Sequence, residues 1–415
     1  MEKWLQDLFP LLDVEQDLLL SKNGDVTIGY QLQLPELFTL SDRDYEAFHQ
    51  VWIKAIKVLP RHTVFHKQDW FVESRHKPNF DTAEARFLAT ASERYFNERP
   101  FLDHSCYLFL TKKPVGRKAA SSLFSNLLQG SIVPAETLRP QAIQEFVDSA
   151  GQLQRILEDS GFVVLKRLGD AELKGNAQRA GIVERYLFLL EQQDRPLVRD
   201  ISFREGICIG DAVGQLYTLA QADDLPPLCG PRVDYDRYST DKTRFSVGFA
   251  AALGQLLSCS HIYNQYVFLD DAQKTLQGLE RKKLRLQSLA AYSRENSISR
   301  DATNDFLNEA IGEQRLPVKA HFNLFCWTDD KARLKELKNK VSSALAGIDA
   351  TTKQETVGAP QIFWAGIPGN AADFPMNDTF DTFAEQATCF LNMETAYRSS
   401  LSPVGIRLGD RLSGR

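Results

Sequence analysis

An alternation of two hydrophobic periods in the first 170 residues constrains the fold more than any other feature of the sequence. Residues 25–40 alternate apolar and polar side chains with the period of two that a half-buried strand requires. The next segment places apolar residues on one helix face, begins with Ser41 and Asp44 as a capping box and stops at Pro60. Short links between such unlike elements predict helices layered on a sheet.

The same alternation continues up to residue 191. Its predicted strands cover residues 62–74, 101–111 and 162–168, and its predicted helices run from a cap at Asp81 and Glu84 to Pro100, from Pro140 to Gly161, and over 170–191. Residues 112–139 are rich in Gly, Ser, Pro and basic side chains, which favours a mobile connection. We therefore expect the helices of this half to cover one face of a sheet.

The second half repeats this layout without a close sequence repeat. Strands are predicted over 200–219, 244–257, 261–269, 318–328 and 361–365, with helices over 270–295, 300–311 and 330–345 and a loop over 223–241. Because 415 residues exceed one comfortable core, the sequence predicts an α+β protein with mixed sheets in two lobes. The lobes span 1–197 and 198–400, and a long helical arm spans 270–312.

Composition excludes several classes of protein. Hydrophobic residues make up 43% and charged residues 25%, which is typical of globular proteins. The longest nearly uncharged apolar run, residues 247–257, is far shorter than the roughly 20 residues that a membrane-spanning helix needs. The start of the chain lacks the features of a signal peptide, so a cytoplasmic location is expected. Six widely separated cysteines are interpreted as reduced, structural thiols.

The charges give a more local signal. With 49 basic against 54 acidic residues, the whole chain should repel nucleic acid. Two basic clusters lie on predicted helices, one within residues 281–285 and one within 331–340. Solvated helix faces explain them, while contact with a partner, phospholipid or DNA stays open. The candidate partner-contact residues are two leucines expected to need cover and three neighbouring cations: Leu279, Leu286, Arg281, Lys282 and Lys283.

The sequence offers no catalytic constellation. It contains no Gly-Lys dipeptide and therefore no P-loop, and it has neither a Rossmann glycine motif nor a Gly-x-Ser-x-Gly elbow. Residues 267–271 imitate a Walker B strand, but a buried strand followed by an aspartate helix cap is the favoured interpretation. His62 and His66 could share a strand face and bind a metal, although ordinary sheet-face histidines are favoured. We expect no enzyme activity, nucleotide site, metal or cofactor in this chain.

Several strings resemble one family. Residues 402–415, SPVGIRLGDRLSGR, are similar to the segment that leads into the motor domain of TraG-type conjugation ATPases of Bacteroidetes-like conjugative transposons. The strand at 25–40, the DLPP loop, the string HIYNQY at 261–266 and the long helix after it follow the order of that family. The resemblance spans nearly the whole chain, but none of these strings is a catalytic signature.

The resemblance implies a function in conjugative DNA transfer. It makes the chain the non-catalytic part of a type IV secretion ATPase, with residues 401–415 as the junction to a P-loop motor that binds ATP and Mg²⁺ in the full-length protein. Docking onto other secretion components at the inner membrane and homo-oligomerisation are the implied roles, at a cytoplasmic, membrane-peripheral location. The alternative is a nucleic-acid-binding adaptor of the same machinery that uses the two basic helices.

Overall fold

One large sheet forms the centre of the molecule. The computed structural model describes residues 5–77, 87–114, 117, 139–192, 194–204 and 206–396. Within them the strand order is β1 (Leu11–Glu15), β2 (Leu18–Ser21), β3 (Val26–Gln33), β5 (Phe101–Lys112), β4 (Thr63–Ser74), β14 (His261–Leu269), β15 (Pro317–Thr328), β11 (Ala212–Leu219), β10 (Ile207–Ile209) and β9 (Ile201–Ser202). Each pair along this order is antiparallel. The predicted α+β class is confirmed at this level.

Strands from both predicted lobes belong to the same sheet. β4 from the first half pairs along its length with β14 from the second half, from Thr63 opposite Leu269 to Phe71 opposite His261. Three shorter strands pair beside the main order, β6 (Val164–Arg167) with β3, β16 (Lys353–Glu355) with β11, and β17 (Phe380–Phe383) with β15. The described residues therefore form a continuous sheet across the expected boundary near residue 198, where two lobes with separate sheets were predicted.

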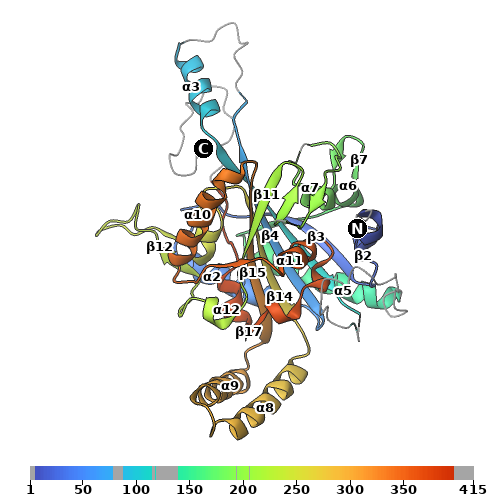
Figure 1. The fold of residues 1–415 in the computed structure, drawn as a ribbon, viewed down its shortest axis with the longest axis vertical. Coiled ribbons are helices and arrows are strands. Elements are labelled where there is room, and N and C mark those ends of the chain that lie inside the picture. Colours follow the sequence, from blue (N-terminus) through green and yellow to red (C-terminus); the bar gives the residue numbers. More distant parts are fainter. Residues whose placement is uncertain are drawn as a thin grey trace.

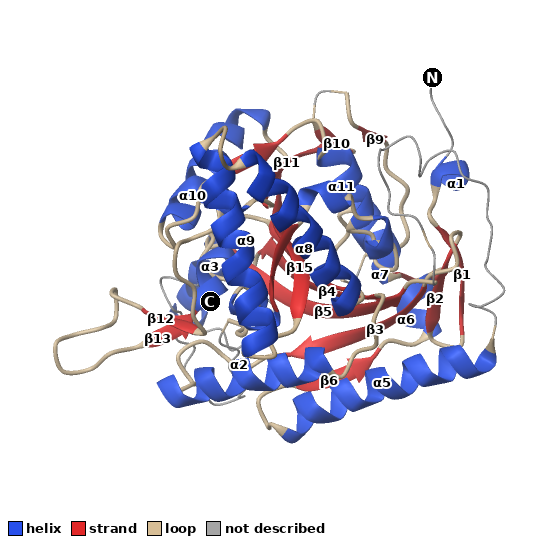
Figure 2. Ribbon diagram, turned by 90° about the horizontal axis from the view of Figure 1, so that it is seen from below, coloured by secondary structure: helices blue, strands red, loops and turns tan. Residues whose placement is uncertain are grey.

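Helices cover both faces of the sheet, not one as the sequence suggested. One face packs against α2 (Asp42–Lys57), α5 (Pro140–Asp159), α10 (Leu334–Ala346) and α12 (Ala384–Cys389), as Figures 1 and 2 show. The other face packs against α7 (Ile182–Phe188) and α11 (Ala359–Ala365). Burial on both faces explains why β4 and β14 carry almost no exposed residue.

Elements with strong local signals match their predictions. The Ser41–Asp44 capping box is present at the start of α2, whose apolar residues are buried. Pro140 opens α5, and Gly161 follows its end with a positive φ of 75°. β4, β5, β14 and β15 lie within a residue of their expected positions. In each case the deciding information lies within the segment itself.

Four predicted elements are wrong. The helix expected over 170–191 divides into α6 (Asp170–Lys174), the hairpin β7 (Gly175–Asn176) and β8 (Arg179–Ala180), and α7. Gly181 allows this close turn, because a Cβ there would lie 2.4 Å from the Leu173 carbonyl oxygen. The strand expected over 244–257 becomes β13 (Ser246–Gly248) and a 3-10 helix, η2 (Phe249–Leu253). The strand expected over 361–365 is the helix α11, which has a proline in its first turn.

The strand expected over 200–219 is also divided. Gly206 and Gly210, both with positive φ, lie in the connections that turn β9 into β10 and β10 into β11. Short elements complete the described chain: α1 (Leu5–Leu8), α3 (Phe87–Glu98), β12 (Arg232–Asp234), η1 (Ala222–Asp224), η3 (Lys331–Arg333), η4 (Ala371–Asp373) and η5 (Met376–Asp378). The predicted cap at residues 81–84, most of the connection 112–139 and the junction 401–415 lie outside the described residues.

A pair of helices lies below the sheet in Figure 1. The segment predicted as a long arm folds back on itself as α8 (Ala272–Leu289) and α9 (Arg294–Gly312). α9 is fixed to the body by Phe306, whose ring stacks on Phe383 of β17 at 4.2 Å between centroids. No helix in the described ranges is both long enough and apolar enough to span a membrane.

Candidate functional site

The structure separates the five candidate contact residues into two groups. Leu286 is buried and Leu279 is half-buried, which fits the expectation that the following helix covers this leucine stripe. Arg281 and Lys282 are exposed. Lys283 is half-buried, and its ammonium lies 3.4 Å from the side-chain oxygen of Asn304 on α9. Arg281 and Lys282, rather than Lys283 or the buried leucine, are therefore available to a partner.

An exposed apolar surface accompanies these cations. The side chain of Leu284 is 62% exposed, and Tyr292, in the turn after α8, is 86% exposed. Residues three and four positions apart share a helix side, so Arg281, Leu284 and Arg285 lie together. We call Arg281, Leu284, Arg285 and Tyr292 the outer face. Sequence reasoning missed its apolar members, although a leucine inside a run of cations is a signal that the helix exposes it.

Two acidic residues on the partner helix are exposed as well. Asp301 and Asp305 lie one turn apart on α9, and Asp301 also pairs with the neighbouring Arg300 at 2.7 Å. α8 carries five basic residues against one acidic residue, whereas the chain as a whole has more acids than bases. The helix pair therefore presents a basic surface and an acidic surface within one small unit. We call Asp301 and Asp305 the acidic face.

The second basic cluster, within residues 331–340, contacts the main body of the protein. Lys340 pairs with Glu336 at 2.9 Å and donates a hydrogen bond of 3.2 Å to the carbonyl oxygen of Ser258. Leu337, between them on α10, is buried in the main core. This cluster thus belongs to a helix that closes the sheet, with Lys331 and Arg333 exposed at its start.

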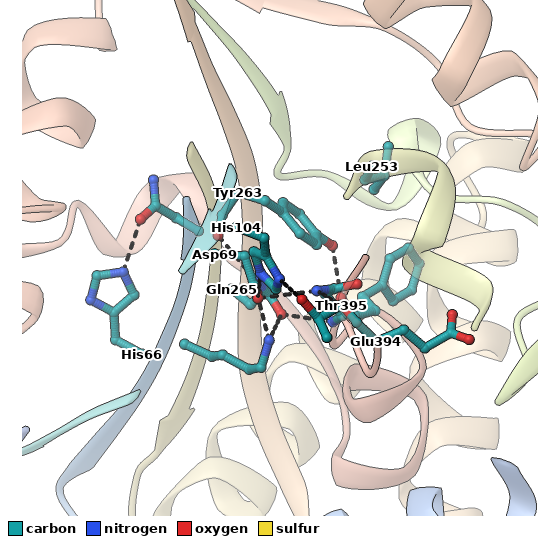
Figure 3. A network of polar contacts seen from close by, with 12 residues as sticks. His66, Asp69, His104, Leu253, Tyr263, Gln265, Glu394 and Thr395 are labelled. Carbon is teal, nitrogen blue, oxygen red and sulfur yellow. Dashed lines mark hydrogen bonds and ion pairs between the residues drawn. The ribbon is translucent and has the colours of Figure 1, made fainter. Parts of the chain in front are cut away.

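A buried polar network crosses the centre of the sheet (Figure 3). Asp69 of β4 accepts hydrogen bonds from Gln265 at 2.7 Å and Asn392 at 3.0 Å, and it lies 2.9 Å from Nε2 of His104. Lys67 forms an ion pair with the same carboxylate, and both partners are fully buried. Burial would raise the pKa of Asp69, but Lys67 and His104 together hold that pKa below its usual range.

The network continues into residues 392–395. Nδ1 of His104 lies 2.8 Å from the Thr395 hydroxyl. Glu394 accepts a hydrogen bond from the Tyr45 hydroxyl and another, at 2.8 Å, from the Gly248 amide. Burial raises the pKa of Glu394 to about 7. These contacts hold residues 392–395, the last described segment, against β4, β5 and α2. The network therefore joins distant parts of the chain.

The two histidines considered as metal ligands lie in different surroundings. His62 precedes β4, and its backbone amide donates to Leu269 at 2.6 Å. His66 is fully buried and stacks on Tyr266 with 4.1 Å between ring centroids. Burial lowers the pKa of His66 to about 4. The described residues contain no cluster of three or more metal-ligating side chains.

Residues 267–271, which imitate a Walker B strand, form the end of a buried strand and a helix cap, which is the interpretation that the sequence favoured. β14 ends at Leu269, and Asp271 is the N-cap of α8, where its carboxylate accepts from the amides of Gln273 at 3.1 Å and Lys274 at 3.3 Å. Asp270 pairs with Lys113 at 3.2 Å. Asp271 therefore caps α8, and Asp270 holds the base of the α8–α9 pair to the residue that follows β5.

Comparison with known proteins adds one partial match. Residues 2–50 match a family described as "Domain of unknown function, B. Theta Gene description", DUF3875. None of the curated proteins matches the chain. The matched segment contains β1 to β3 and the first half of α2, which form one end of the sheet and the start of its helical cover. The chain is thus similar, over this segment, to a family whose function is not known.

Proposed function

We propose that this chain is the docking and oligomerisation part of a TraG-type conjugation ATPase of a type IV secretion system, without a catalytic role of its own. The resemblance of residues 402–415 and of the earlier strings supports this proposal, and the B. theta description of the family matched by residues 2–50 agrees with a Bacteroidetes source. In the proposal, residues 401–415 lead to a motor domain that binds ATP and Mg²⁺. The site of action is the cytoplasmic side of the inner membrane, beside other secretion components.

The exposed outer face of the α8–α9 pair is the observation that carries the proposal. Leu284 exposes a large apolar side chain next to Arg281 and Arg285, and Tyr292 exposes another in the turn after α8. Within the described part of the chain, neither arginine pairs with a carboxylate. An apolar patch rimmed by charged side chains is typical of an association surface. The helix pair thus serves as the contact arm of the proposal.

The partner that this surface fits is a second copy of the chain. The outer face of α8 is basic, and the acidic face of α9 offers two carboxylates at Asp301 and Asp305. A basic surface of one copy can meet the acidic surface of the next, while Leu284 and Tyr292 become buried between them. Such a contact forms twice in a two-fold dimer, where each copy offers both surfaces to the other, or once per subunit boundary in a ring or chain.

A charge exchange tests this contact. Arg281→Glu with Arg285→Glu should reduce self-association of the chain in sedimentation velocity, because both helix pairs then present acids. Combining that variant with Asp301→Lys and Asp305→Lys should restore it, since the attraction returns with reversed signs. Arg43→Glu with Lys54→Glu, two exposed cations of α2, is the matched control and should leave association unchanged. Equal loss in the control, or no recovery in the combined variant, would contradict the contact.

Nucleic-acid binding is the second candidate function, and one observation favours it. The exposed cations of α8 have no carboxylate partner among the described residues, so they are free to neutralise phosphates. A salt series of single-stranded DNA binding separates the candidates. An adaptor should lose affinity with a log–log slope of roughly 0.7 per phosphate contact, and Leu284→Asp should change that slope little. A scaffold should lose self-association on Leu284→Asp and bind DNA only weakly at every salt concentration.

A further inference from the structure

A buried arginine beside β5 has no acid to balance its charge. Arg185 of α7 is 5% exposed, and no carboxylate in the described part of the chain forms an ion pair with it. Its Nη1 donates a hydrogen bond of 2.8 Å to the Tyr107 hydroxyl, whereas its Nε is buried without a hydrogen-bond partner. A guanidinium stays positively charged in proteins, and burying a charge is costly unless that charge is paired and hydrogen-bonded. Arg185 therefore needs an anion that the described residues do not supply.

Arg117, another largely buried arginine, shows how this fold balances such a charge by itself. Its side chain is 11% exposed and forms ion pairs with two buried carboxylates, that of Asp25 at 3.1 Å and that of Asp373. These two acids lie far apart in the sequence, so the fold brings both of them to one guanidinium. Arg185 has no such acid among the described residues, and its site therefore differs from that of Arg117 in charge.

Aromatic rings lie beside Arg185 in place of acids. Its guanidinium carbon is 5.1 Å from the centre of the Trp70 ring and 5.8 Å from that of the Tyr107 ring. The faces of these rings attract a cation but carry no net charge. The Tyr107 hydroxyl accepts from Arg185, and the described residues contain no acceptor for its own hydrogen. Arg185 and Tyr107 thus each keep a hydrogen-bond donor for a ligand.

A small cavity lies at these donors. Arg185 and Tyr107 line it together with residues of β3, α6 and the β7–β8 hairpin, and its volume is about 130 Å³. α6, β7 and α7 lie together at the upper right of Figure 1. Asn176 and Arg179 of the hairpin line the cavity and are exposed, which opens this side to solvent. The cavity holds several water molecules or one small anion, and it is smaller than the roughly 300 Å³ from which pockets for drug-sized ligands begin.

The charges around the cavity favour an anion. Arg179 adds a second cation, which forms no ion pair in the described part of the chain and whose Nε donates to the Gln192 carbonyl oxygen at 3.0 Å. Among the described residues that line the cavity, Glu172 is the only acid, and its carboxylate pairs at 2.5 Å with the ammonium of Lys166. Two arginines therefore line the cavity against one carboxylate that already has a counter-ion.

We propose that this cavity binds a small oxyanion, with free inorganic phosphate as the ligand that fits it best. Guanidinium and phosphate form charge-assisted hydrogen bonds, in which the N–H groups donate to the phosphate oxygens. Arg185 supplies the buried charge, Tyr107 donates its hydroxyl hydrogen, and Arg179 contacts the anion from the exposed hairpin. The bound anion balances Arg185 and joins α7 and the hairpin to β5.

Calorimetric titration of the full chain with sodium phosphate tests the site, at pH 7 and with the ionic strength held constant by sodium chloride. We expect one phosphate per chain with a dissociation constant on the order of 1 mM or lower. Arg185→Met should weaken this binding about tenfold or more, and Arg179→Met several-fold, because each removes a charge-assisted hydrogen bond. Arg155→Met is the matched control and should leave binding unchanged, since Arg155 is exposed on α5, which covers the opposite face of the sheet.

Chemical denaturation separates an anion site from a purely structural arginine. Phosphate should raise the denaturation midpoint of the unaltered chain, because a ligand that binds only the folded state stabilises it. Arg185→Met should abolish this response. In phosphate-free buffer its midpoint should equal or exceed that of the unaltered chain, since the substitution removes a buried, unpaired charge. A structural arginine predicts the reverse, a lower midpoint in the variant and no response to phosphate in the unaltered chain.

Titration with AMP distinguishes free phosphate from a phosphate group on a larger molecule. The cavity is too small for a nucleoside, so AMP should bind about tenfold or more weakly than phosphate. An AMP affinity equal to that of phosphate would overturn the assignment to a free ion.

Phosphate binding that is unchanged in both Arg185→Met and Arg179→Met would also overturn the inference. Arg179 is exposed, so its variant decides the matter even if Arg185→Met does not fold. None of these readouts depends on the proposed docking role.

Discussion

Polar side chains are buried and hydrogen-bonded at the centre of the sheet, whereas those of the α8–α9 pair are exposed to solvent. Around Asp69, charged and amide groups are fully buried, and each carboxylate oxygen receives hydrogen bonds from partners far apart in the chain. On α8, cations and a leucine stand in solvent without described partners. The first arrangement makes stability depend on every member of the network. The second leaves a surface whose residues can change without disturbing the fold, which is what a binding surface requires.

Removing the central carboxylate should have the largest effect on stability. Asp69→Ala leaves the Lys67 ammonium buried without its counter-ion and removes the partner of Nε2 of His104. We expect the free energy of unfolding to fall by about 3–5 kcal/mol. Chemical denaturation measures this loss. Asp381→Ala, which breaks the partly exposed pair with Lys319, is the control and should cost at most about 1 kcal/mol. Similar losses in both variants would remove the distinction between the two regions.

The second-largest effect on stability is expected from leucines on the two sides of α8, which should differ from each other. Leu286 is 9% exposed and packs between the helices, so Leu286→Ala should destabilise the protein by about 2–3 kcal/mol. Leu284→Ala should change stability by less than about 0.5 kcal/mol, because its side chain already contacts water. The same denaturation experiment measures both. A large loss of stability in Leu284→Ala would show that Leu284 is buried in a core and does not belong to the outer face.

The pH dependence of stability should reveal the buried histidine. Burial holds the pKa of His66 at about 4 in the folded protein, against 6.5 in the unfolded chain. The unfolded chain therefore binds more protons at this residue between these values, and His66 alone lowers stability by roughly 2–3 kcal/mol as pH drops from 6.5 to 4. His321, whose pKa burial lowers to about 3, acts in the same direction. Glu394 has the opposite sign, since its raised pKa of about 7 adds stability at low pH that is lost as pH rises from 4.5.

Comparison with a non-titrating variant isolates the histidine. His66→Phe keeps an aromatic ring against Tyr266 and removes the imidazole, while the contribution of Glu394 is common to both proteins. The difference in unfolding free energy between the two should change with pH only below about 6.5. A difference that is constant from pH 7 to 4 would show that His66 does not titrate as its burial requires.

The smallest expected effect is on nucleotide binding. The proposal assigns ATP and Mg²⁺ to a motor domain outside this chain, and residues 1–415 contain no P-loop sequence. Calorimetric titration of the chain with Mg-ATP should therefore give no saturable heat. Micromolar affinity for Mg-ATP would contradict the proposal that nucleotide binding belongs to the motor domain.

Local signals were sufficient for part of the fold and insufficient for the rest. The caps of α2 and α5 and the period of β4 and β14 lie within their own segments, so these elements could be predicted. The break between α6 and α7 depends on how closely Gly181 approaches Leu173, which no periodicity records. A short apolar run such as residues 361–365 suits a strand and a helix equally, and here packing decides for the helix.

The polar network lay beyond prediction for a different reason. Asp69, His104 and Asn392 are distant in sequence, and only the register of β4 against β5 and β14 brings their partners together. The outer face could be predicted from the sequence only in part. Arg281 and Lys282 could be named from the sequence, but the exposure of Leu284 follows from how α9 covers the opposite side of α8.

DNA transfer by donor cells that carry the proposed full-length ATPase tests the central claim most directly. Arg281→Glu with Arg285→Glu should lower transfer frequency about tenfold or more, and the combined exchange with Asp301→Lys and Asp305→Lys should restore most of it. ATP hydrolysis per subunit in the absence of assembly partners should stay the same in all three proteins. Unaltered transfer in the first variant, or a loss that the combined exchange does not restore, would contradict a docking and oligomerisation role for the α8–α9 pair.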